Sequence, residues 1–518
     1  MSDTVTVKKD ATEALADQAG IYRLLVRGGG ESLEVDWDEG AKVTPMGSVV
    51  FFAQFLKTGG LLERLCESTP LSYGSNNAPA ARDVLGTVLL SILNGQTRYA
   101  HIGALRGDRV GAEALEMSKV VSEDCVRRAL KRGTYEAWDT WLGKQERAVW
   151  EPLLAEPYVL DIDSTVKPLY GHQEGAELGY NPRKPGRPSH NYHTYLIGSL
   201  RLVLGVEVRP GKEHAGGCGM PSLWKLLDSL PPQCRPRLLR GDVSYGSEDT
   251  MAEAEKRGQP YLFKLRRSAK VKAKFRELTA PADGWEDAGD GWQASECPLT
   301  LSGWTTARRC VFLRRPAQKA KAGPGAPATP EFEFARALGG TQEWDYVVLV
   351  TNDTALTAFA LSQAYRDRGD CENVFDEIKN QWGWAGFMTR DLRRCRIIAR
   401  LIALVYNWWN VFTRLAQPDS HMEAVTSRPL LLHAVGRLVS TGRRKIIHLT
   451  PTHALSEHIR LVLNRIGGFM NKLASTAEQL SVEAVWAIIL SAAFVKWLQG
   501  RVLHPVSEGS QCLLLLQT

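Results

Sequence analysis

The spacing of hydrophobic residues changes along the chain from a helical pattern to a strand pattern and back. Between about residues 81 and 142, apolar residues recur every three or four positions in LGTVLLSILNG, AHIGALRGD and SEDCVRRALKRGTYEAWDTWL, which predicts short helices in series. From residue 158, short apolar runs bounded by turn residues predict strands in PYVLDIDST, TYLIGSLRLVLGVEV, RPRLLRGD and QPYLFKL, with one helical stretch, MPSLWKLLDSL. Strands mixed with helices indicate an α/β or α+β core.

An irregular segment then separates this region from a second helical one. Residues 266–352 contain short strand-like runs and the tract PAQKAKAGPGAPATP, whose composition is typical of a loop or linker. After the strand DYVVLVTN, a helical pattern returns at LTAFALSQAYRDRGDCENVFDEIKNQ and continues into the C-terminal region. We therefore predict a mixed α/β fold in which a strand-rich insertion divides the core, with helical regions at both ends.

The length and composition of the chain indicate how many packed units it forms and in which cellular compartment it lies. A chain of 518 residues is too long for one core, so about two to four packed units are expected. Its 64 Lys and Arg exceed its 57 Asp and Glu, a balance that permits DNA binding without showing it. The nine cysteines include no CxxC pair, the N-terminus has no secretory apolar run, and the longest apolar run, residues 484–495, is shorter than the roughly 20 residues of a membrane span. We expect a soluble, cytoplasmic protein with no membrane association.

Carboxylates stand at the ends of two predicted strands. In VLDIDST, the two-residue strand period places Asp161 and Asp163 on one face. Burying such a pair requires a cation, a hydrogen-bond network or a metal ion. Asp242 ends the strand in RLLRGD, although an aspartate there would also suit the cap of a following helix. Because adjacent strand ends converge, these carboxylates could share one metal ion.

A third acidic residue belongs to a predicted helix. Tyr365, Arg368, Glu372 and Lys379 are separated by 3, 4 and 7 residues, so all four would lie on one helical face. A solvent-exposed stripe of ion pairs would explain this spacing equally well. With the two strand-end aspartates, Glu372 would complete the three acidic ligands that a two-metal site for phosphodiester displacement requires. The lack of paired Cys and His spacings in the sequence favours Mg²⁺ or Mn²⁺ over zinc.

The same four residues carry a resemblance to a known enzyme family. Tyr365, Arg368, Glu372 and Lys379 fit without a gap the signature Y-x2-R-x3-E-x6-K of the DDE transposases of bacterial insertion sequences. DIDST is similar to the family's first catalytic strand and RGDVSYGS to its second-aspartate turn, and GYNPRKPGRPSHNYH and VTND match as well. The resemblance spans roughly residues 80–415, and the signature is its most specific part.

The resemblance implies an RNase H-like core interrupted by a β-rich insertion, with the first Asp on the first strand, the second Asp after the fourth and the Glu on a later helix. It implies that Asp163, Asp242 and Glu372 are catalytic and together hold two Mg²⁺ ions, for which Mn²⁺ can substitute. Asp163 fits better than its neighbour because the family's aspartate is closely followed by a threonine, as in Asp-Ser-Thr here, and Asp161 remains a further candidate ligand. One departure is Gly369, which costs the signature helix roughly 1 kcal/mol relative to alanine.

Basic clusters flank the carboxylate motifs and could neutralise DNA phosphates. They are Arg183, Lys184 and Arg187 in a loop rich in Pro and Gly, residues 264–276, and residues 390–400. The expected DNA contacts also include three signature residues, namely Tyr365, Arg368 and Lys379. Any one cluster could equally be a solvated surface.

Two further features have two interpretations each. Ser122 can cap a helix that carries Arg127, Arg128, Lys131 and Arg132, which would suit a recognition helix or a solvated basic face. Three tryptophans of the insertion could stack on an unpaired base at a transposon end or form the small core of the insertion, and we favour the second; they are Trp285, Trp292 and Trp304.

Taken with the resemblance, these motifs imply a transposase that cleaves DNA at the ends of an insertion sequence and joins the freed 3′-hydroxyl to target DNA. Its partners would be double-stranded DNA, as terminal inverted repeats and target, and a second copy in a homodimer that pairs the ends, close to the bacterial nucleoid. A catalytically silent, transposase-derived DNA-binding protein and a metal-dependent nuclease without strand transfer remain open alternatives. The expected organisation is an N-terminal region (1–75), a helical DNA-binding region (76–150), a first part of the catalytic core (151–261), the insertion (262–352), a second part of the core with the signature (353–415) and a helical C-terminal region (416–518).

Overall fold

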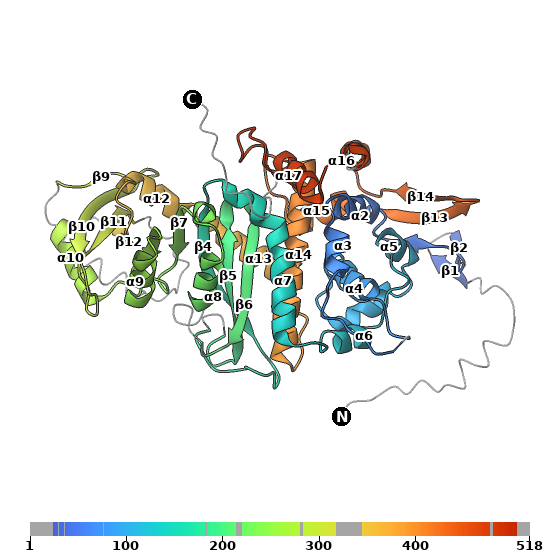
Figure 1. Cartoon of the computed structure of the whole chain (residues 1–518), viewed down its shortest axis with the longest axis horizontal. Helices are drawn as coiled ribbons and strands as arrows, with labels where there is room; N and C mark the ends of the chain where they lie inside the picture. The colour runs from blue at the N-terminus through green and yellow to red at the C-terminus, as the bar shows by residue number, and fades with distance from the viewer. Residues whose placement is uncertain are drawn as a thin grey trace.

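The computed structural model describes residues 24–28, 31–35, 37–75, 77–181, 184–213, 220–279, 283–317, 344–476 and 480–504. The molecule is elongated: the insertion lies at the left of Figure 1, the main sheet in the middle, and the N-terminal helices at the right. None of the helices in these ranges is both long enough and apolar enough to cross a membrane.

The N-terminal part is mainly helical, and the helices that the sequence predicts between about residues 81 and 142 are present. Its elements are β1 (Leu24–Gly28), β2 (Glu31–Val35), β3 (Val43–Thr44), α2 (Val49–Thr58), α3 (Leu61–Cys66), α4 (Ala81–Leu93), α5 (Arg109–Ala114), α6 (Glu123–Ala129) and α7 (Tyr135–Trp150). The Ser122 side chain caps α6 by accepting a hydrogen bond from the Cys125 backbone amide, which confirms the predicted start of this helix. The helix ends at Ala129, so the expectation that it also carries Lys131 and Arg132 is wrong.

The central sheet has the strand order of an RNase H-like core. Its elements are β4 (Val159–Pro168), β5 (Ser189–Ile197), β6 (Leu202–Pro210), α8 (Met220–Asp228), β7 (Leu238–Gly241), α9 (Glu248–Lys256) and β8 (Tyr261–Lys264). The strands lie in the order β6-β5-β4-β7-β8. The first three pair antiparallel, whereas β4, β7 and β8 run parallel. The predicted fold class is confirmed.

The insertion prolongs this sheet sideways. Its elements are α10 (Ala269–Thr279), β9 (Glu286–Asp287), β10 (Gln293–Leu299), β11 (Arg308–Pro316) and β12 (Trp344–Thr351). Strand β12 pairs antiparallel with β8, and β11, β10 and β9 follow outward, so one sheet of nine strands runs through core and insertion. The following helix, α12 (Ala358–Arg366), packs on β10 and closes a small hydrophobic core that the insertion shares with β7 and β8.

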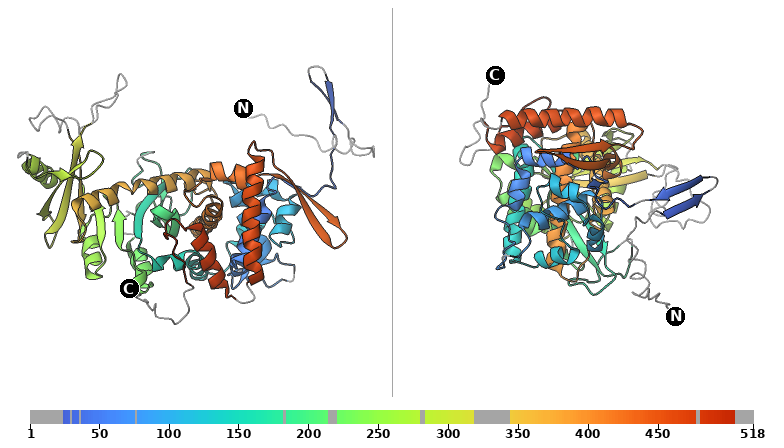
Figure 2. Two further views of the ribbon diagram at one scale, coloured as in Figure 1. Left: turned by 90° about the horizontal axis from the view of Figure 1, so that it is seen from above. Right: turned by 90° about the vertical axis from the view of Figure 1, so that its right-hand side faces the viewer.

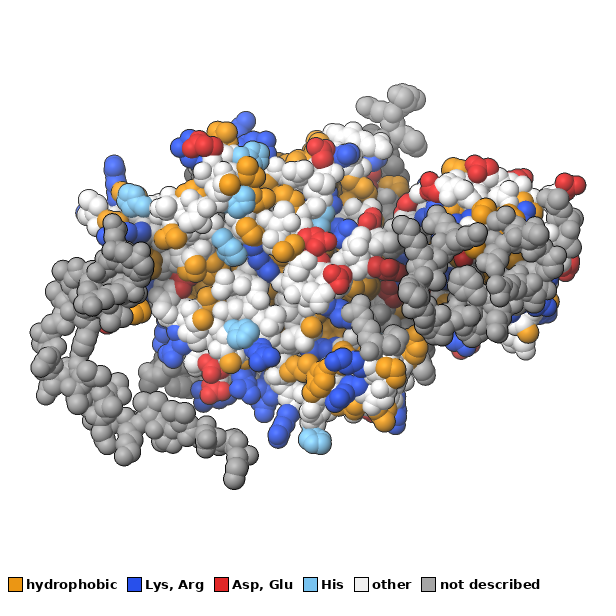
Figure 3. Space-filling view, turned by 180° about the vertical axis from the view of Figure 1, so that it is seen from behind, with side chains coloured by type: hydrophobic (Ala, Val, Ile, Leu, Met, Phe, Trp, Pro, Cys, Tyr) orange, Lys and Arg blue, Asp and Glu red, His pale blue; other side chains and the backbone are white. Residues whose placement is uncertain are grey.

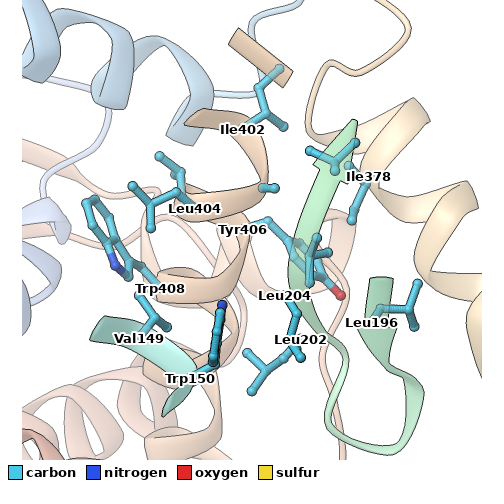
Figure 4. Packing of buried hydrophobic residues seen from close by; sticks show 14 of the residues in the cluster. Val149, Trp150, Leu196, Leu202, Leu204, Ile378, Ile402, Leu404, Tyr406 and Trp408 are labelled. Atoms are coloured by element: carbon cyan, nitrogen blue, oxygen red, sulfur yellow. The ribbon is translucent and has the colours of Figure 1, made fainter. Parts of the chain in front are cut away.

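Helix α14 (Leu392–Ala416) covers the other edge of the sheet, at β6. The Asn407 side chain accepts a hydrogen bond from the Val203 amide at 2.9 Å and donates one to the Val203 carbonyl at 2.7 Å, as a neighbouring strand would. Buried aromatic and aliphatic residues of α7, α13, α14 and the sheet pack beside this contact (Figure 4). The edge strand therefore has no free main-chain groups at Val203 that could pair with another chain.

The signature segment forms two helices, and the expectation of one continuous helix is wrong. Tyr365 lies in α12, Arg368 is the N-cap of the next helix, and Glu372 and Lys379 lie in α13 (Gly369–Gln381). At the junction, the Arg368 amide donates to the Tyr365 carbonyl and the Cys371 amide donates to the Arg368 carbonyl, three-residue steps that tighten the backbone. A helix-weakening glycine at this point suits such a break.

The C-terminal region is helical, as predicted, but also contains a β-hairpin. Its elements are α15 (Ala424–Leu431), β13 (Val435–Thr441), β14 (Arg444–Thr450), α16 (Ser456–Thr476) and α17 (Val482–Ala493). Strand β13 pairs with β14 and with β3 of the N-terminal region. Figure 2 shows that the hairpin projects from the body of the molecule.

Candidate active site

Two expected catalytic aspartates stand side by side because of the register between β4 and β7. These strands are parallel, with Asp161 opposite Arg240 and Ile162 opposite Gly241. The next residue of each strand is therefore Asp163 in β4 and Asp242 just after β7, and in parallel strands such partners point to the same side of the sheet. The Asp242 carboxylate accepts a hydrogen bond from the Ser244 amide at 2.9 Å. The cap of α9 is Ser247, so Asp242 does not fill that alternative role.

The charge of Asp163 is held in an unfavourable setting. Its side chain is 14% exposed, and burial raises the pKa of this carboxyl to about 7, with a further raising effect from Asp242 and an opposing one from Arg368. The Arg368 guanidinium forms an ion pair with one carboxylate oxygen, and the Ser164 amide donates to the other at 2.7 Å. A largely buried carboxylate with a second, partly exposed carboxylate beside it creates a demand for positive charge.

Asp161, two residues earlier, has a different partner. The Arg240 guanidinium binds both of its oxygens, at 2.5 and 2.8 Å, and also donates to the Ala364 carbonyl. Asp161 and Arg240 are both buried. This fork ties β4, β7 and the end of α12 together, so the oxygens of Asp161 are already engaged by a cation. The role of Arg240 was not predicted, although its two-residue spacing from Asp242 repeats the spacing of the two aspartates in β4.

The signature residues reach this site in different ways. Tyr365 is largely buried, which raises the pKa of its hydroxyl to about 12, and both site aspartates contribute to this rise. The Lys379 ammonium donates to the Thr165 hydroxyl at 2.9 Å and the Val166 carbonyl at 3.2 Å, which fastens α13 to β4. Glu372 is 76% exposed, and its nearest described cation is Arg368, 3.9 Å away. Arg368 thus stands between the acid of the helix and the acids of the sheet.

The donor set is the kind that a hard divalent cation prefers. Asp163 and Asp242 offer carboxylate oxygens at one point, and Glu372 lies in the first turn of α13, which packs against β4. Among the described residues, no three His, Cys, Asp or Glu side chains are already gathered in a metal-binding arrangement. The three residues therefore fit a hard metal ion in their chemistry, and the two aspartates also in their position, whereas Glu372 would have to turn inward from the surface to join them.

Outside the signature, the expected DNA-binding residues lie on exposed surfaces where the structure describes them. Arg127 and Arg128 are exposed on α6, and Arg127 is 3.6 Å from Asp124. Lys184 and Arg187 lie over the ring of Tyr170, at 5.0 and 4.8 Å from its centre. Arg183 lies outside the described residues. Lys and Arg side chains gather along the lower edge of the molecule in Figure 3, the edge where α6 lies in Figure 1.

Arginines of the basic cluster at residues 390–400 mainly form contacts within the protein. Arg393 donates to the main-chain carbonyls of Arg132 and Gly133 just beyond α6. Arg400 is buried and binds Glu146 at 2.9 and 2.6 Å, and also Asp139. The expectation that this cluster as a whole contacts phosphates is wrong, because interior ion pairs and helix ends engage these arginines.

The tryptophans of the insertion also serve its own packing. The Arg314 guanidinium lies between the rings of Trp285 and Trp344, at 3.9 and 4.4 Å from their centres. Trp292 packs under Arg315 at 4.6 Å, and the third, Trp304, contacts Arg308 at 5.2 Å. All three predicted tryptophans are partly buried, which favours the interpretation that they build the insertion.

The similarity of this chain to known proteins covers most of its length. A family model described as Transposase DDE domain group 1 matches residues 27–470. Among solved structures, the chain is similar to the cryo-EM structure of a piggyBac transposase synaptic complex with hairpin DNA, with 10% sequence identity and a TM-score of 0.38, over 86% of this chain and 85% of that chain. No curated protein matches the chain.

Proposed function

This chain belongs to the transposase DDE domain group 1 family, and on that premise we propose that it is a DNA transposase of the bacterial insertion-sequence group with the Y-R-E-K signature. It cleaves DNA at the ends of its element and transfers the freed 3′-hydroxyl to target DNA. The observation that carries the proposal is the pair of adjacent aspartates, Asp163 and Asp242, with Arg368 of the signature bound to the first of them.

Asp163, Asp242 and Glu372 are the residues that would hold the metal, Mg²⁺ or Mn²⁺ and two ions in number. Bound there, such ions activate a water or a 3′-hydroxyl and stabilise the leaving oxygen of the displaced phosphodiester. Two parallel strands keep the oxygens of the aspartates in place, whereas Glu372 sits on the first turn of α13 and can rotate without disturbing the sheet. Arg240 holds Asp161 as a support of the site.

The other signature residues position the substrate. Arg368 has a planar fork of donors that can exchange a carboxylate for a phosphate of similar geometry. Tyr365 keeps its proton because its pKa is about 12, so it presents a neutral hydroxyl donor to DNA at any physiological pH. Lys379 acts indirectly: its hydrogen bonds to β4 set the distance between α13 and the two aspartates.

DNA outside the scissile bond would lie along the exposed cations. Among these exposed cations, Lys184 and Arg187, between β4 and β5, and Arg127 and Arg128 of α6 are the proposed phosphate contacts. Arg183, which lies outside the described residues, is proposed as a further contact from the sequence. The proposed assembly is a homodimer that pairs two terminal inverted repeats. Its proposed place is the cytoplasm, at the nucleoid. In this proposal the regions 76–150, 151–261, 262–352 and 353–415 act respectively as DNA-binding helices, first core part, insertion and second core part.

The test is to incubate the purified protein with Mg²⁺ and duplex DNA that carries the sequences flanking its own gene. Cleavage at the element ends together with joined products is the expected result. Cleavage without joined products would identify a nuclease, and binding without cleavage would identify a silent DNA-binding descendant; either result would overturn the proposal.

A further inference from the structure

The hairpin of β13 and β14, residues 435–450 and here called the β13–β14 ribbon, carries positive charge without acidic residues. From Ala424 to Ser456 the sequence contains no Asp or Glu. Within the ribbon this stretch supplies Arg437, Arg443, Arg444, Lys445 and His448. This excess of basic residues is local, because in the whole chain the number of Lys and Arg residues nearly equals the number of Asp and Glu residues.

One face of the ribbon is open to solvent along its whole length. Strand pairing places Arg437 opposite His448, Val439 opposite Ile446 and Thr441 opposite Arg444, so these pairs share a face. Apart from the partly buried Val439, all of these side chains are exposed, and the turn residues between the strands are exposed as well. The opposite face buries Gly436 and Leu438 against the protein. The ribbon is thus a two-stranded arm with a packed back and a basic front.

The base of the ribbon is rigidly attached. Gly47 approaches the ribbon so closely that a Cβ atom on it would lie 2.9 Å from the Gly436 Cα. The Gly47 amide donates to the Ala434 carbonyl at 2.7 Å, and β3 pairs with β13. Such an attachment keeps the arm extended before any partner binds, which lowers the entropy cost of binding.

The arginines of the front lack acidic partners. Lys445 forms an ion pair with Glu113 of α5. In the described parts of the chain, no ion pair joins Arg437, Arg443 or Arg444 to a carboxylate. Asp38, which lines the same shallow depression as Arg437, accepts hydrogen bonds from the amides of its own loop at 3.1 and 3.0 Å.

Two simpler explanations account for only part of this pattern. Cations on an edge strand discourage pairing with other chains, which would explain β14 but not Arg437 on the central strand β13. Contact with the ribbon of a second copy would bring identical cations together across a two-fold axis, which is repulsive. A polyanionic partner would explain the cations on both strands, β13 and β14. A two-stranded β-ribbon also fits the major groove of B-form DNA.

We propose that the β13–β14 ribbon binds the phosphates of duplex DNA, with its basic front in or along the major groove. The inference rests on the proposed transposase function, and it adds a contact that lies away from the site of cleavage. In Figure 1 the ribbon projects from the right end of the molecule, whereas β4 and β7 lie left of its centre. Blue and pale-blue side chains also mark this end in the space-filling view of Figure 3. The ribbon therefore holds DNA some distance from the scissile phosphate.

The test compares two triple variants of the full-length protein. One replaces ribbon cations, Arg437→Ala, Arg443→Ala and Arg444→Ala; the matched control removes the same charge from exposed cations elsewhere, Arg460→Ala, Lys472→Ala and Lys496→Ala. Binding to a fluorescein-labelled 40-base-pair duplex from the element end is followed by anisotropy between 50 and 300 mM KCl. Because each phosphate contact contributes about 0.9 to the slope of log K against log salt, the ribbon variant should lose nearly three units of slope and on the order of 10²-fold in affinity at 0.15 M salt.

The control should bind within about threefold of wild type. If the ribbon variant keeps the wild-type slope, or changes only the oligomeric state in light scattering, the proposal is overturned. If the ribbon variant loses the slope while wild type binds but never cleaves the duplex, the proposed transposase function fails and the ribbon proposal stands. Arg443→Gln with Arg444→Gln, confined to the turn end of the ribbon, repeats the test should the triple variant fold poorly.

Discussion

At the scale of single residues, two aspartates on one face of β4 have opposite electrostatic surroundings. Asp161 accepts hydrogen bonds from two nitrogens of the buried Arg240 guanidinium, whereas Asp163 is largely buried beside Asp242 and its pKa is raised to about 7. We predict that Asp161→Asn destabilises the protein by about 3–5 kcal/mol, because it leaves Arg240 charged and buried without a counter-charge. Asp163→Asn should instead abolish cleavage with little loss of stability. Urea unfolding and single-turnover cleavage of the two variants measure both effects.

The assignment of roles would have to be exchanged if Asp161→Asn were fully stable and inactive while Asp163→Asn still cleaved DNA. Asp370→Asn on the exposed side of α13 serves as the control, since its carboxylate is 49% exposed and 3.5 Å from Arg201. It should change neither quantity appreciably.

A substitution of Arg368 should affect the affinity for DNA and the rate of cleavage to different extents. A charge-assisted contact contributes about 1.5–3 kcal/mol, and a phosphate misplaced by about 1 Å can cost on the order of 10²-fold in rate. We predict that Arg368→Ala binds element ends within a few-fold of wild type but cleaves at least tenfold more slowly at saturating DNA. Arg187→Ala, on the exposed loop, should mainly weaken binding. End affinity and single-turnover rate are measured for both.

Arg368→Lys adds a control for geometry, because lysine restores the charge without the planar fork and should recover little of the rate. A wild-type cleavage rate for Arg368→Ala at saturating DNA would mean that its ion pair with Asp163 serves the fold alone.

At the scale of elements, the edge of the sheet depends on one amide side chain. Asn407 supplies both the donor and the acceptor for Val203 of β6. We predict that Asn407→Leu lowers the free energy of unfolding by about 2–5 kcal/mol, because it leaves two buried main-chain groups without partners at about 1–3 kcal/mol each. The exposed Asn464 of α16 gives the matched control, and Asn464→Leu should be nearly neutral. Equal stability of the two variants in urea unfolding would show that β6 finds another partner.

At the scale of the whole molecule, an ion-pair cluster joins the insertion to the core. Arg308 of β11 binds Glu248 and Glu255 of α9, and its hydrogen bond lowers the pKa of Glu248 to about 2. Because this pKa lies below the ordinary value of 4.5, the pair stabilises the fold above pH 4.5 and is lost as the pH falls toward 2. Arg308→Met should therefore cost about 2–3 kcal/mol at pH 7, less than a fully buried pair because the glutamates keep some solvent contact, and the difference from wild type should shrink toward pH 2.

Urea unfolding at a series of pH values measures this difference, and hydrogen exchange shows where it acts. Faster exchange should appear in β10 and β11. Arg315 pairs with Asp345 inside the insertion, so Arg315→Met is the control and should show no such dependence. A constant difference between wild type and Arg308→Met from pH 7 to pH 2 would contradict a role for these glutamates.

Much of the architecture followed from local pattern. Alternation in VLDIDST predicted a strand with both aspartates on one face, Ser122 marked a helix start, and the strand-like runs between residues 266 and 352 predicted an insertion of strands. The RNase H-like core came from the family resemblance, and the structure confirms it. These features depend on residues close together in the sequence or on a motif, so they can be inferred without knowing which segments meet.

The differences between similar residues were decided by tertiary structure. No spacing could show that Arg240 would bind Asp161 and Arg368 would bind Asp163, because the β4–β7 register and the α12–α13 junction set those partners. For the same reason, the sequence suggested that Arg400 lies on the surface, whereas the structure shows that it is buried and pairs with Glu146 of another helix. Sequence by itself determined which residues could carry charge and, within the strand β4, on which face they stand. Only the folded chain decided which charges meet, because burial and register set the free energy of each pair.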